Sequence, residues 1–147
     1  MLYRPLLNKH KLSNVVAKVL SADSYSRGES NLSVSELIDS PRVVQLKRHH
    51  KTEQDISELV AARLGTAWHA YAEKILENEE DLIIEKRYYV DIDGLILSGQ
   101  LDIQKIIGDK KIHIYDWKVT SSAKIQAALT STWEKQLNCY AYLARHA

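Results

Sequence analysis

Three segments between residues 82 and 119 have the composition of β-strands, and the connection between the first two is typical of a hairpin. Residues 82–91 are rich in Ile, Tyr and Val, and a second strand is predicted from about Leu95 to Ile107, with a bend or bulge near Gly99. Asp93-Gly94 lies between them, and this dipeptide accepts the positive backbone angles of a tight turn. After a further turn at residues 108–111, the third strand is predicted over Ile112–Val119. These segments predict a sheet built around a β-hairpin.

Helical patterns precede and follow these strands in the sequence. Ser33-Val34-Ser35-Glu36 is a capping-box pattern, which predicts a short helix that ends before Pro41. Gly65 suits the end of one helix and Thr66 suits the cap of the next, whereas the Ser-rich residues 21–31 predict a loop. Helices are predicted over residues 34–38, 42–49, 54–64, 67–80 and 133–145. This order predicts an α/β fold, or α+β if hairpins dominate, in which helices flank a central sheet of three or more strands.

Composition sets limits on the class of protein. A chain of 147 residues with 45% hydrophobic and 27% charged residues predicts a single globular domain. The net charge of +1 means that any contact with nucleic acid must come from a local patch. Cys139 is the one cysteine, so neither an internal disulfide nor a four-cysteine metal site can form. No stretch approaches the ~20 apolar residues of a membrane span, and residues 1–11 do not resemble a signal peptide, so a cytoplasmic protein is expected.

The third predicted strand carries an aspartate and a lysine on an otherwise apolar face. Strand alternation places Asp116 and Lys118 on the same side as Ile112 and Ile114. Burying these charges would cost several kcal/mol unless they are paired or the aspartate binds a metal. The alternative interpretation is an Asp–Lys salt bridge at a solvated strand end.

A second aspartate, Asp102, lies on the strand that is expected to pair with the third. A cross-strand neighbour can bring Asp102 within a few ångströms of Asp116, and two such carboxylates repel unless a divalent cation lies between them. Oxygen ligands suit magnesium or manganese rather than zinc. The alternative is that Asp102 faces solvent on the hairpin.

Two helical pairs complete the candidate site. His69 and Glu73 are one turn apart, and so are Gln136 and Tyr140. A lone helical histidine is more often structural, Tyr140 could pack in the core, and Gln136 could be exposed.

Taken in order, these residues resemble a known family. Gly65-Thr66-x-x-His69, Gly99-x-x-Asp102, Asp116-Trp117-Lys118 and Gln136-x-x-x-Tyr140 resemble the RecB-like branch of the PD-(D/E)XK nucleases, and in particular phage-encoded members. The resemblance covers about residues 33 to 143, so residues 1–32 would be a variable N-terminal extension. It implies a restriction-endonuclease-like core and a metal-dependent DNA nuclease, exonuclease-like, that acts in recombination, repair or phage DNA processing.

The resemblance also implies a role for each matching residue. Asp102, Asp116, His69 and the backbone carbonyl of Trp117 would bind Mg²⁺ or Mn²⁺. Lys118 would position the attacking water and stabilise charge at the phosphate. Gln136 and Tyr140 would orient the DNA or the active-site groups, and Glu73 is a further candidate, because only some relatives use an acidic residue there.

The sequence departs from the family in two ways. The family fold usually continues past the helix of Gln136 and Tyr140, so we expect either a truncated chain or completion by a second copy or a partner protein. Some relatives hold an iron–sulfur cluster on four cysteines, and a single cysteine excludes that subtype. The missing elements leave an alternative function open, a non-cleaving DNA-binding or assembly module that retains the nuclease fold.

Basic side chains that could contact DNA phosphates occur in two regions, one before residue 52 and one around the last helix. They are Arg42, Lys47, Arg48, Lys51, Lys124 and Lys135. A solvated helix surface explains them equally well.

Overall fold

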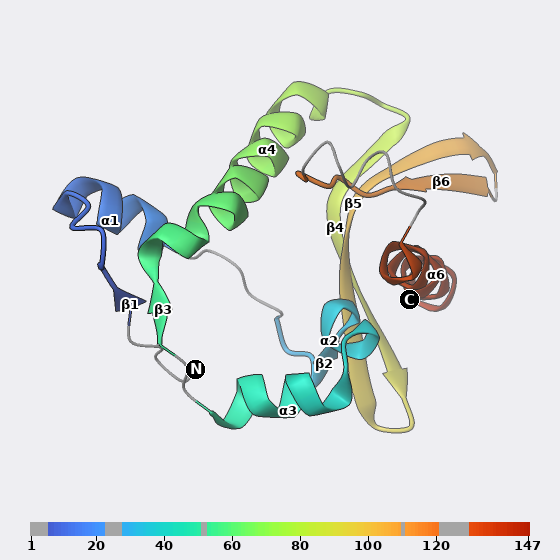
Figure 1. Cartoon of the computed structure of the whole chain (residues 1–147). Coiled ribbons are helices and arrows are strands. Elements are labelled where there is room, and N and C mark those ends of the chain that lie inside the picture. The colour runs from blue at the N-terminus through green and yellow to red at the C-terminus, as the bar shows by residue number, and fades with distance from the viewer. Residues whose placement is uncertain (1–5, 23–27, 51–52, 110, 121–129) are drawn as a thin grey trace.

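The computed structural model describes residues 6–22, 28–50, 53–109, 111–120 and 130–147, and its architecture is α+β, as predicted (Figure 1). The centre is a mixed sheet. β5 (Leu95–Gly108) pairs antiparallel with β4 (Leu82–Ile92) and with β6 (Lys111–Tyr115), and it pairs in parallel with β2 (Leu32–Ser33). β5 is therefore the central strand, with β4 along one edge and with β2 and β6 along the other.

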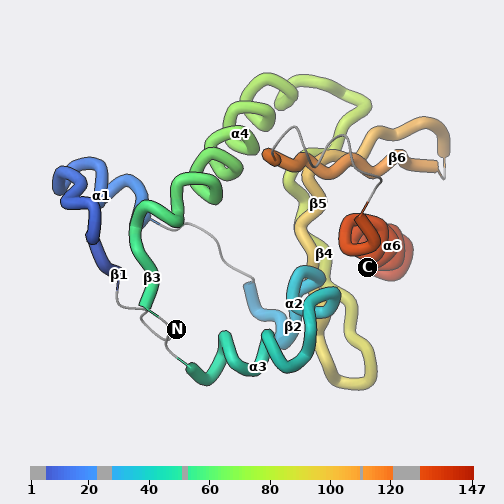
Figure 2. The backbone as a smooth tube through the Cα atoms, in the orientation of Figure 1, coloured from blue at the N-terminus to red at the C-terminus, as the bar shows by residue number. Residues whose placement is uncertain are grey.

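The predicted hairpin is confirmed. Ile92 pairs with Leu95, and the two residues between them have positive φ angles, 52° for Asp93 and 84° for Gly94. These angles match the tight turn that an Asp-Gly dipeptide favours. The two strands form a long twisted ribbon through the middle of the molecule (Figure 2).

The third strand is shorter than predicted. Strand alternation indicated Ile112–Val119, whereas β6 ends at Tyr115. The physical reason is a change of hydrogen-bond partner, because the backbone N–H of Trp117 donates to the side chain of Asp102 instead of to a strand carbonyl. Asp116 and Lys118 therefore follow the strand rather than lie within it.

No bulge occurs near Gly99, because Gly99 pairs regularly with Tyr88. A Cβ atom at Gly99 would lie 2.7 Å from Leu143 Cδ1 and 3.0 Å from Val34 Cγ2, so close packing explains the glycine. The irregular positions are elsewhere. Glu85 has a φ of 48° within β4, and the register between β5 and β6 shifts between Ile106 and Gly108.

One long helix, α4 (Val60–Leu76), replaces the two helices that were predicted to meet at Gly65. A glycine inside a helix costs about 1 kcal/mol relative to alanine, which is not enough to end this one. Thr66 does not cap a new helix, because its hydroxyl donates to the carbonyl of Ala62 over 3.1 Å. A 3-10 turn, η1 (Ile56–Leu59), and the short strand β3 (Gln54–Asp55) precede α4.

The helices α2 (Val34–Ile38), α3 (Pro41–His49) and α6 (Ser131–His146) agree with prediction to within two residues at each end. Ser33 and Glu36 form both halves of the predicted capping box. Figure 1 shows α6 and α4 on opposite sides of the β4–β5 ribbon. The buried core lies on the α6 side and consists of Val34, Val90, Leu97, Leu101, Tyr140 and Leu143.

The N-terminal region contains structure that the sequence analysis did not anticipate. β1 (Leu6–Leu7) pairs in parallel with β3, and α1 (Asn14–Ser21) is capped by Ser13. The loop predicted at residues 21–31 begins after Ser21, and its residues 23–27 lie outside the described part of the chain.

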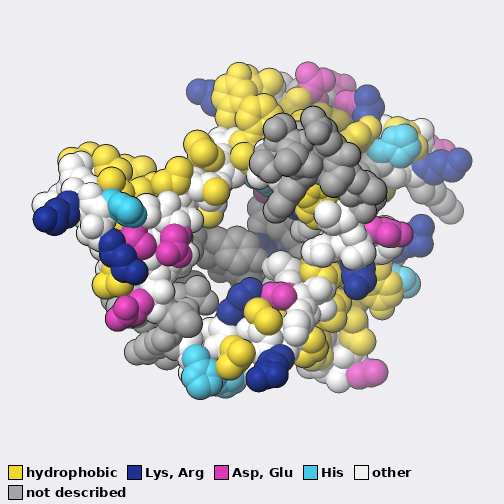
Figure 3. Space-filling model, in the orientation of Figure 1, with side chains coloured by type: hydrophobic (Ala, Val, Ile, Leu, Met, Phe, Trp, Pro, Cys, Tyr) yellow, Lys and Arg dark blue, Asp and Glu magenta, His cyan; other side chains and the backbone are white. Residues whose placement is uncertain are grey.

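Apolar side chains remain on the surface along α1 and α4 (Figure 3). On α4 they recur at helical spacing, at Val60, Leu64, Trp68, Tyr71 and Ile75. No helix of the described residues has the length and apolar character that a membrane crossing requires.

Candidate metal centre

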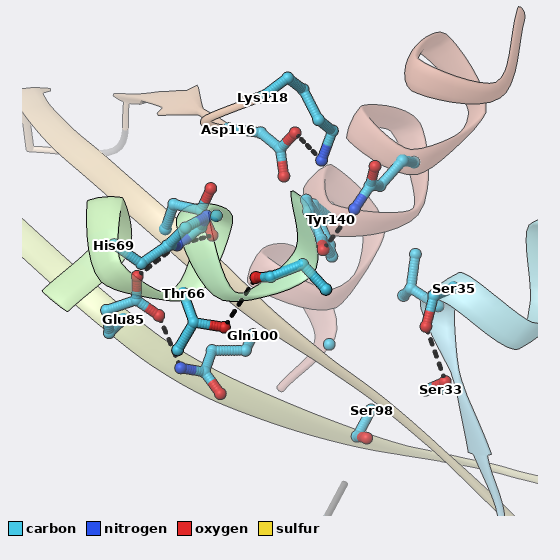
Figure 4. Close-up of a pocket in the computed structure, with 16 residues that line it drawn as sticks. Ser33, Ser35, Thr66, His69, Glu85, Ser98, Gln100, Asp116, Lys118 and Tyr140 are labelled. Carbon is cyan, nitrogen blue, oxygen red and sulfur yellow. Dashed lines mark hydrogen bonds and ion pairs between the residues drawn. The ribbon is translucent and has the colours of Figure 1, made fainter. Parts of the chain in front are cut away.

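One pocket of about 610 Å³ brings together the residues that the sequence analysis singled out. Its walls come from α4, β4, β5, α6, the end of β2 with the start of α2, and the segment after β6 (Figure 4). All six candidates whose side chains were assigned a role in metal binding or catalysis line it: His69, Asp102, Asp116, Lys118, Gln136 and Tyr140.

Asp102 lies at the buried end of this pocket. It belongs to β5, the central strand, and only 6% of its surface is exposed. Its Oδ2 accepts a hydrogen bond of 2.6 Å from the backbone N–H of Trp117, and its Oδ1 lies 3.5 Å from Nδ1 of His69. Burial, together with the nearby charges of Asp116 and Glu85, raises the pKa of Asp102 to about 6, against the lowering effects of Trp117 and His69.

Asp116 and Lys118 form an ion pair at the pocket. Asp116 directly follows Tyr115, which pairs with Ile103 at the end of β6, and the charge of Asp116 acts on the Asp102 carboxyl. The Asp116 side chain is 8% exposed and that of Lys118 is 32% exposed. The salt bridge proposed as the alternative interpretation therefore exists, but it lies in the pocket beside a second carboxylate rather than at a solvated edge.

His69 reaches the site from α4 and contacts an acidic residue that the sequence analysis missed. Its Nδ1 lies 2.9 Å from Oε1 of Glu85, on β4. A sequence signal for Glu85 did exist. Counting outward from the turn at Asp93-Gly94 places Glu85 opposite Asp102, and the pairs on either side of it confirm this register.

His69, Glu85 and Asp102 can each offer one ligand atom, and these atoms all lie within 4.8 Å of one another. One imidazole and two carboxylates are a suitable donor set for a divalent cation. The carboxylates favour Mg²⁺ and Mn²⁺ over softer metals, and the imidazole favours Mn²⁺ over Mg²⁺. The side-chain chemistry therefore fits the predicted metal, with Glu85 as an additional candidate ligand. Coordination by the carbonyl of Trp117 stays a prediction.

Gln136 and Tyr140 face the pocket from α6. Nε2 of Gln136 donates to the Tyr140 hydroxyl over 2.7 Å. Tyr140 is 7% exposed and belongs to the core cluster, so it both packs in the interior and lines the pocket. Core packing, the alternative considered for Tyr140, is therefore confirmed, and its role toward a substrate stays a prediction.

The remaining candidates lie outside the pocket. Glu73 is exposed on α4 and does not line it. Lys47 pairs with Asp39 over 2.8 Å, and Arg48 pairs with Glu36 over 3.0 Å. Two of the predicted phosphate contacts are thus engaged within the protein.

The other basic candidates divide into two groups. Arg42 and Lys135 are exposed and make no ion pair with another described residue. Lys51 and Lys124 lie outside the described residues.

Comparison with known proteins supports the fold alone. No protein-family model matches the sequence, and no curated protein matches it. A solved structure described as the crystal structure of SSO0001 superposes with a TM-score of 0.61 and 19% sequence identity, over 89% of this chain and 65% of that one. The chain therefore spans about 65% of the length of that neighbour.

Proposed function

We propose that this chain is a metal-dependent DNA nuclease. The observation that carries the proposal is the convergence of His69, Glu85 and Asp102 on one point, with the Asp116–Lys118 pair beside them in the same pocket. Three carboxylates at one end of a pocket repel each other, and a bound cation would remove that repulsion. A purely structural salt bridge would require only Asp116, which pairs with Lys118, and not the two further carboxylates.

Phosphodiester hydrolysis breaks a P–O ester bond by addition of water. It requires an activated water and stabilisation of the negative charge that develops on the phosphoryl oxygens. When bound, the cation would polarise the phosphate and lower the pKa of a coordinated water. His69, Asp102 and Glu85 would hold it, and Asp116, whose charge acts on Asp102, is the further candidate ligand.

The other pocket residues would act on the substrate. The side chain of Lys118 is 32% exposed, and its ammonium group can reach a phosphate oxygen or the attacking water once Asp116 turns to the cation. The Gln136–Tyr140 pair presents an amide and a hydroxyl to the pocket from α6, where they can bond to the phosphate backbone. We expect an exonuclease-like enzyme of DNA recombination, repair or phage DNA processing that acts in the cytoplasm.

A cleavage assay tests the proposal. Linear, circular and single-stranded DNA are incubated with the wild-type chain in Mg²⁺, Mn²⁺ or chelator, beside Asp116→Asn and the control Asp109→Asn. Asp109 is exposed in the turn between β5 and β6, away from the pocket. The expected result is cleavage that needs the metal, is lost in Asp116→Asn and is retained in Asp109→Asn.

Each other outcome has a definite meaning. Cleavage that persists in Asp116→Asn would remove the basis for the assignment. A folded wild-type chain that binds DNA but cuts none of the three substrates would instead indicate a binding module on this fold. The ratio of linear to circular cleavage distinguishes an exonuclease from an endonuclease.

A further inference from the structure

Glu85 has an unusual backbone conformation at the pocket. Its φ of 48° is uncommon for a residue with a side chain, and it occurs in the middle of a strand. Ile84 and Lys86, on either side, keep their regular partners Ile103 and Leu101. The departure is therefore confined to one residue, and such local strain persists where the surrounding contacts enforce it.

Both oxygens of the Glu85 carboxylate have partners. Oε1 lies 2.9 Å from Nδ1 of His69, and Oε2 accepts a hydrogen bond of 2.6 Å from Nε2 of Gln100 (Figure 4). The amide oxygen of Gln100 in turn accepts a hydrogen bond of 2.7 Å from the guanidinium group of Arg87. A continuous chain of hydrogen bonds thus runs from Arg87 through Gln100 to Glu85 and on to His69.

The direction of this chain is fixed by chemistry. A guanidinium group can only donate, so the Gln100 amide must turn its oxygen toward Arg87. Its NH₂ group then faces the Glu85 carboxylate, which can only accept when ionised. Arg87 therefore prevents the amide from rotating into the orientation that would repel Glu85.

The strand register explains why these residues meet. Arg87 pairs directly with Gln100, and two residues further along the hairpin Glu85 stands opposite Asp102. Residues two apart lie on the same face of a strand, so Gln100 reaches Glu85 diagonally across the two strands.

We propose that Gln100, held by Arg87, is a positioning residue that fixes the Glu85 carboxylate as a ligand of the metal site. This inference rests on the proposed function, because it assigns Glu85 to the same cation. Groups that hydrogen-bond to metal ligands typically change metal affinity by about 10- to 100-fold when they are removed. The expected effect of Gln100 is therefore on metal binding, and it acts through Glu85, because its amide is bonded to Arg87 and Glu85.

Mn²⁺ titration by calorimetry tests the proposal in the full chain. Gln100→Met keeps the length of the side chain and removes its hydrogen bonds, and it should weaken Mn²⁺ binding by about 10-fold or more. Gln45→Met is the matched control, since Gln45 is exposed on α3 and does not line the pocket. Thermal unfolding in chelator establishes that each variant is folded.

A double-mutant cycle separates positioning from a general structural effect. In a Glu85→Gln background, Gln100→Met should cause no further loss of Mn²⁺ affinity, because the residue through which it acts has already been changed. Unchanged affinity in Gln100→Met, or an equal loss with and without Glu85, would overturn the proposal.

The Mn²⁺ affinity of the wild-type chain also distinguishes failure of the nuclease proposal from failure of the proposal for Gln100. A wild-type chain that binds Mn²⁺ but cleaves no DNA contradicts the nuclease assignment and leaves the positioning role of Gln100 to be decided by the cycle. A wild-type chain with no measurable Mn²⁺ affinity overturns both.

Discussion

The backbone N–H of Trp117 donates a hydrogen bond of 2.6 Å to Oδ2 of Asp102. This contact joins the segment after β6 to the centre of β5. Asp116 and Lys118 flank Trp117 in the sequence, so the same contact holds both of them at the pocket. A buried carboxylate is thus stabilised in part by the backbone of the segment that supplies the second carboxylate.

Replacement of Asp102 by asparagine should stabilise the metal-free protein at neutral pH. The pKa of Asp102 is raised by burial to about 6 from a usual 3.8, so the native state binds more protons than the unfolded chain between these values. The contribution of Asp102 to stability therefore falls as the pH rises from about 4 to 6 and stays unfavourable above that. Asparagine can still accept the hydrogen bond from Trp117.

The expected gain for Asp102→Asn is between about 1 and 3 kcal/mol at pH 7.5, measured by denaturant unfolding in chelator. The difference from wild type should disappear by about pH 4. Saturating Mn²⁺ should reverse the order, because only the wild type gains binding energy. A variant that is less stable than wild type at pH 7.5 without metal would contradict the assignment of an unfavourable buried charge.

Two glycine-to-alanine changes should have opposite effects on the free energy of unfolding. At Gly99, a Cβ atom would lie 3.0 Å or less from side-chain atoms of Leu143, Tyr140 and Val34, all of them buried. Overpacking of this kind costs about 1–3 kcal/mol. At Gly65, within α4, a Cβ atom meets nothing within 4 Å, and alanine should stabilise the helix by about 0.5–1 kcal/mol. Chemical denaturation of both variants checks this, and equal effects would contradict the packing explanation for Gly99.

The basic side chains should differ in their contribution to DNA binding. Lys135 is exposed beside Gln136 and has no ion pair among the described residues, whereas Lys47 is paired with Asp39. If Lys135 contacts a phosphate, Lys135→Ala should lower affinity and reduce the slope of log K against log salt by about 1. Lys47→Ala is the control and should leave that slope unchanged. Fluorescence anisotropy over a salt series measures both, and identical slopes in wild type and Lys135→Ala would exclude the contact.

Local signals in the sequence were sufficient for the β4–β5 hairpin and for the start of α2. Asp93-Gly94 specified the hairpin because few other dipeptides accept two positive φ angles, and Ser33 with Glu36 specified the start of α2 through reciprocal capping. Gly65 was a misleading signal, because a glycine inside a helix costs only about 1 kcal/mol relative to alanine and α4 continues through it.

The sequence by itself determined β4, β5, the hairpin turn between them and, through the register of that hairpin, the placement of Glu85 opposite Asp102. These follow from interactions between residues that are near in the chain or joined by a tight turn. Only the tertiary structure decided that His69 of α4 meets Glu85, that Gln100 and Arg87 support it, and that α6 brings Gln136 and Tyr140 to the same pocket. Periodicity gives the face of an element on which a side chain lies, but the partner of that face is set by packing between segments that are distant in sequence.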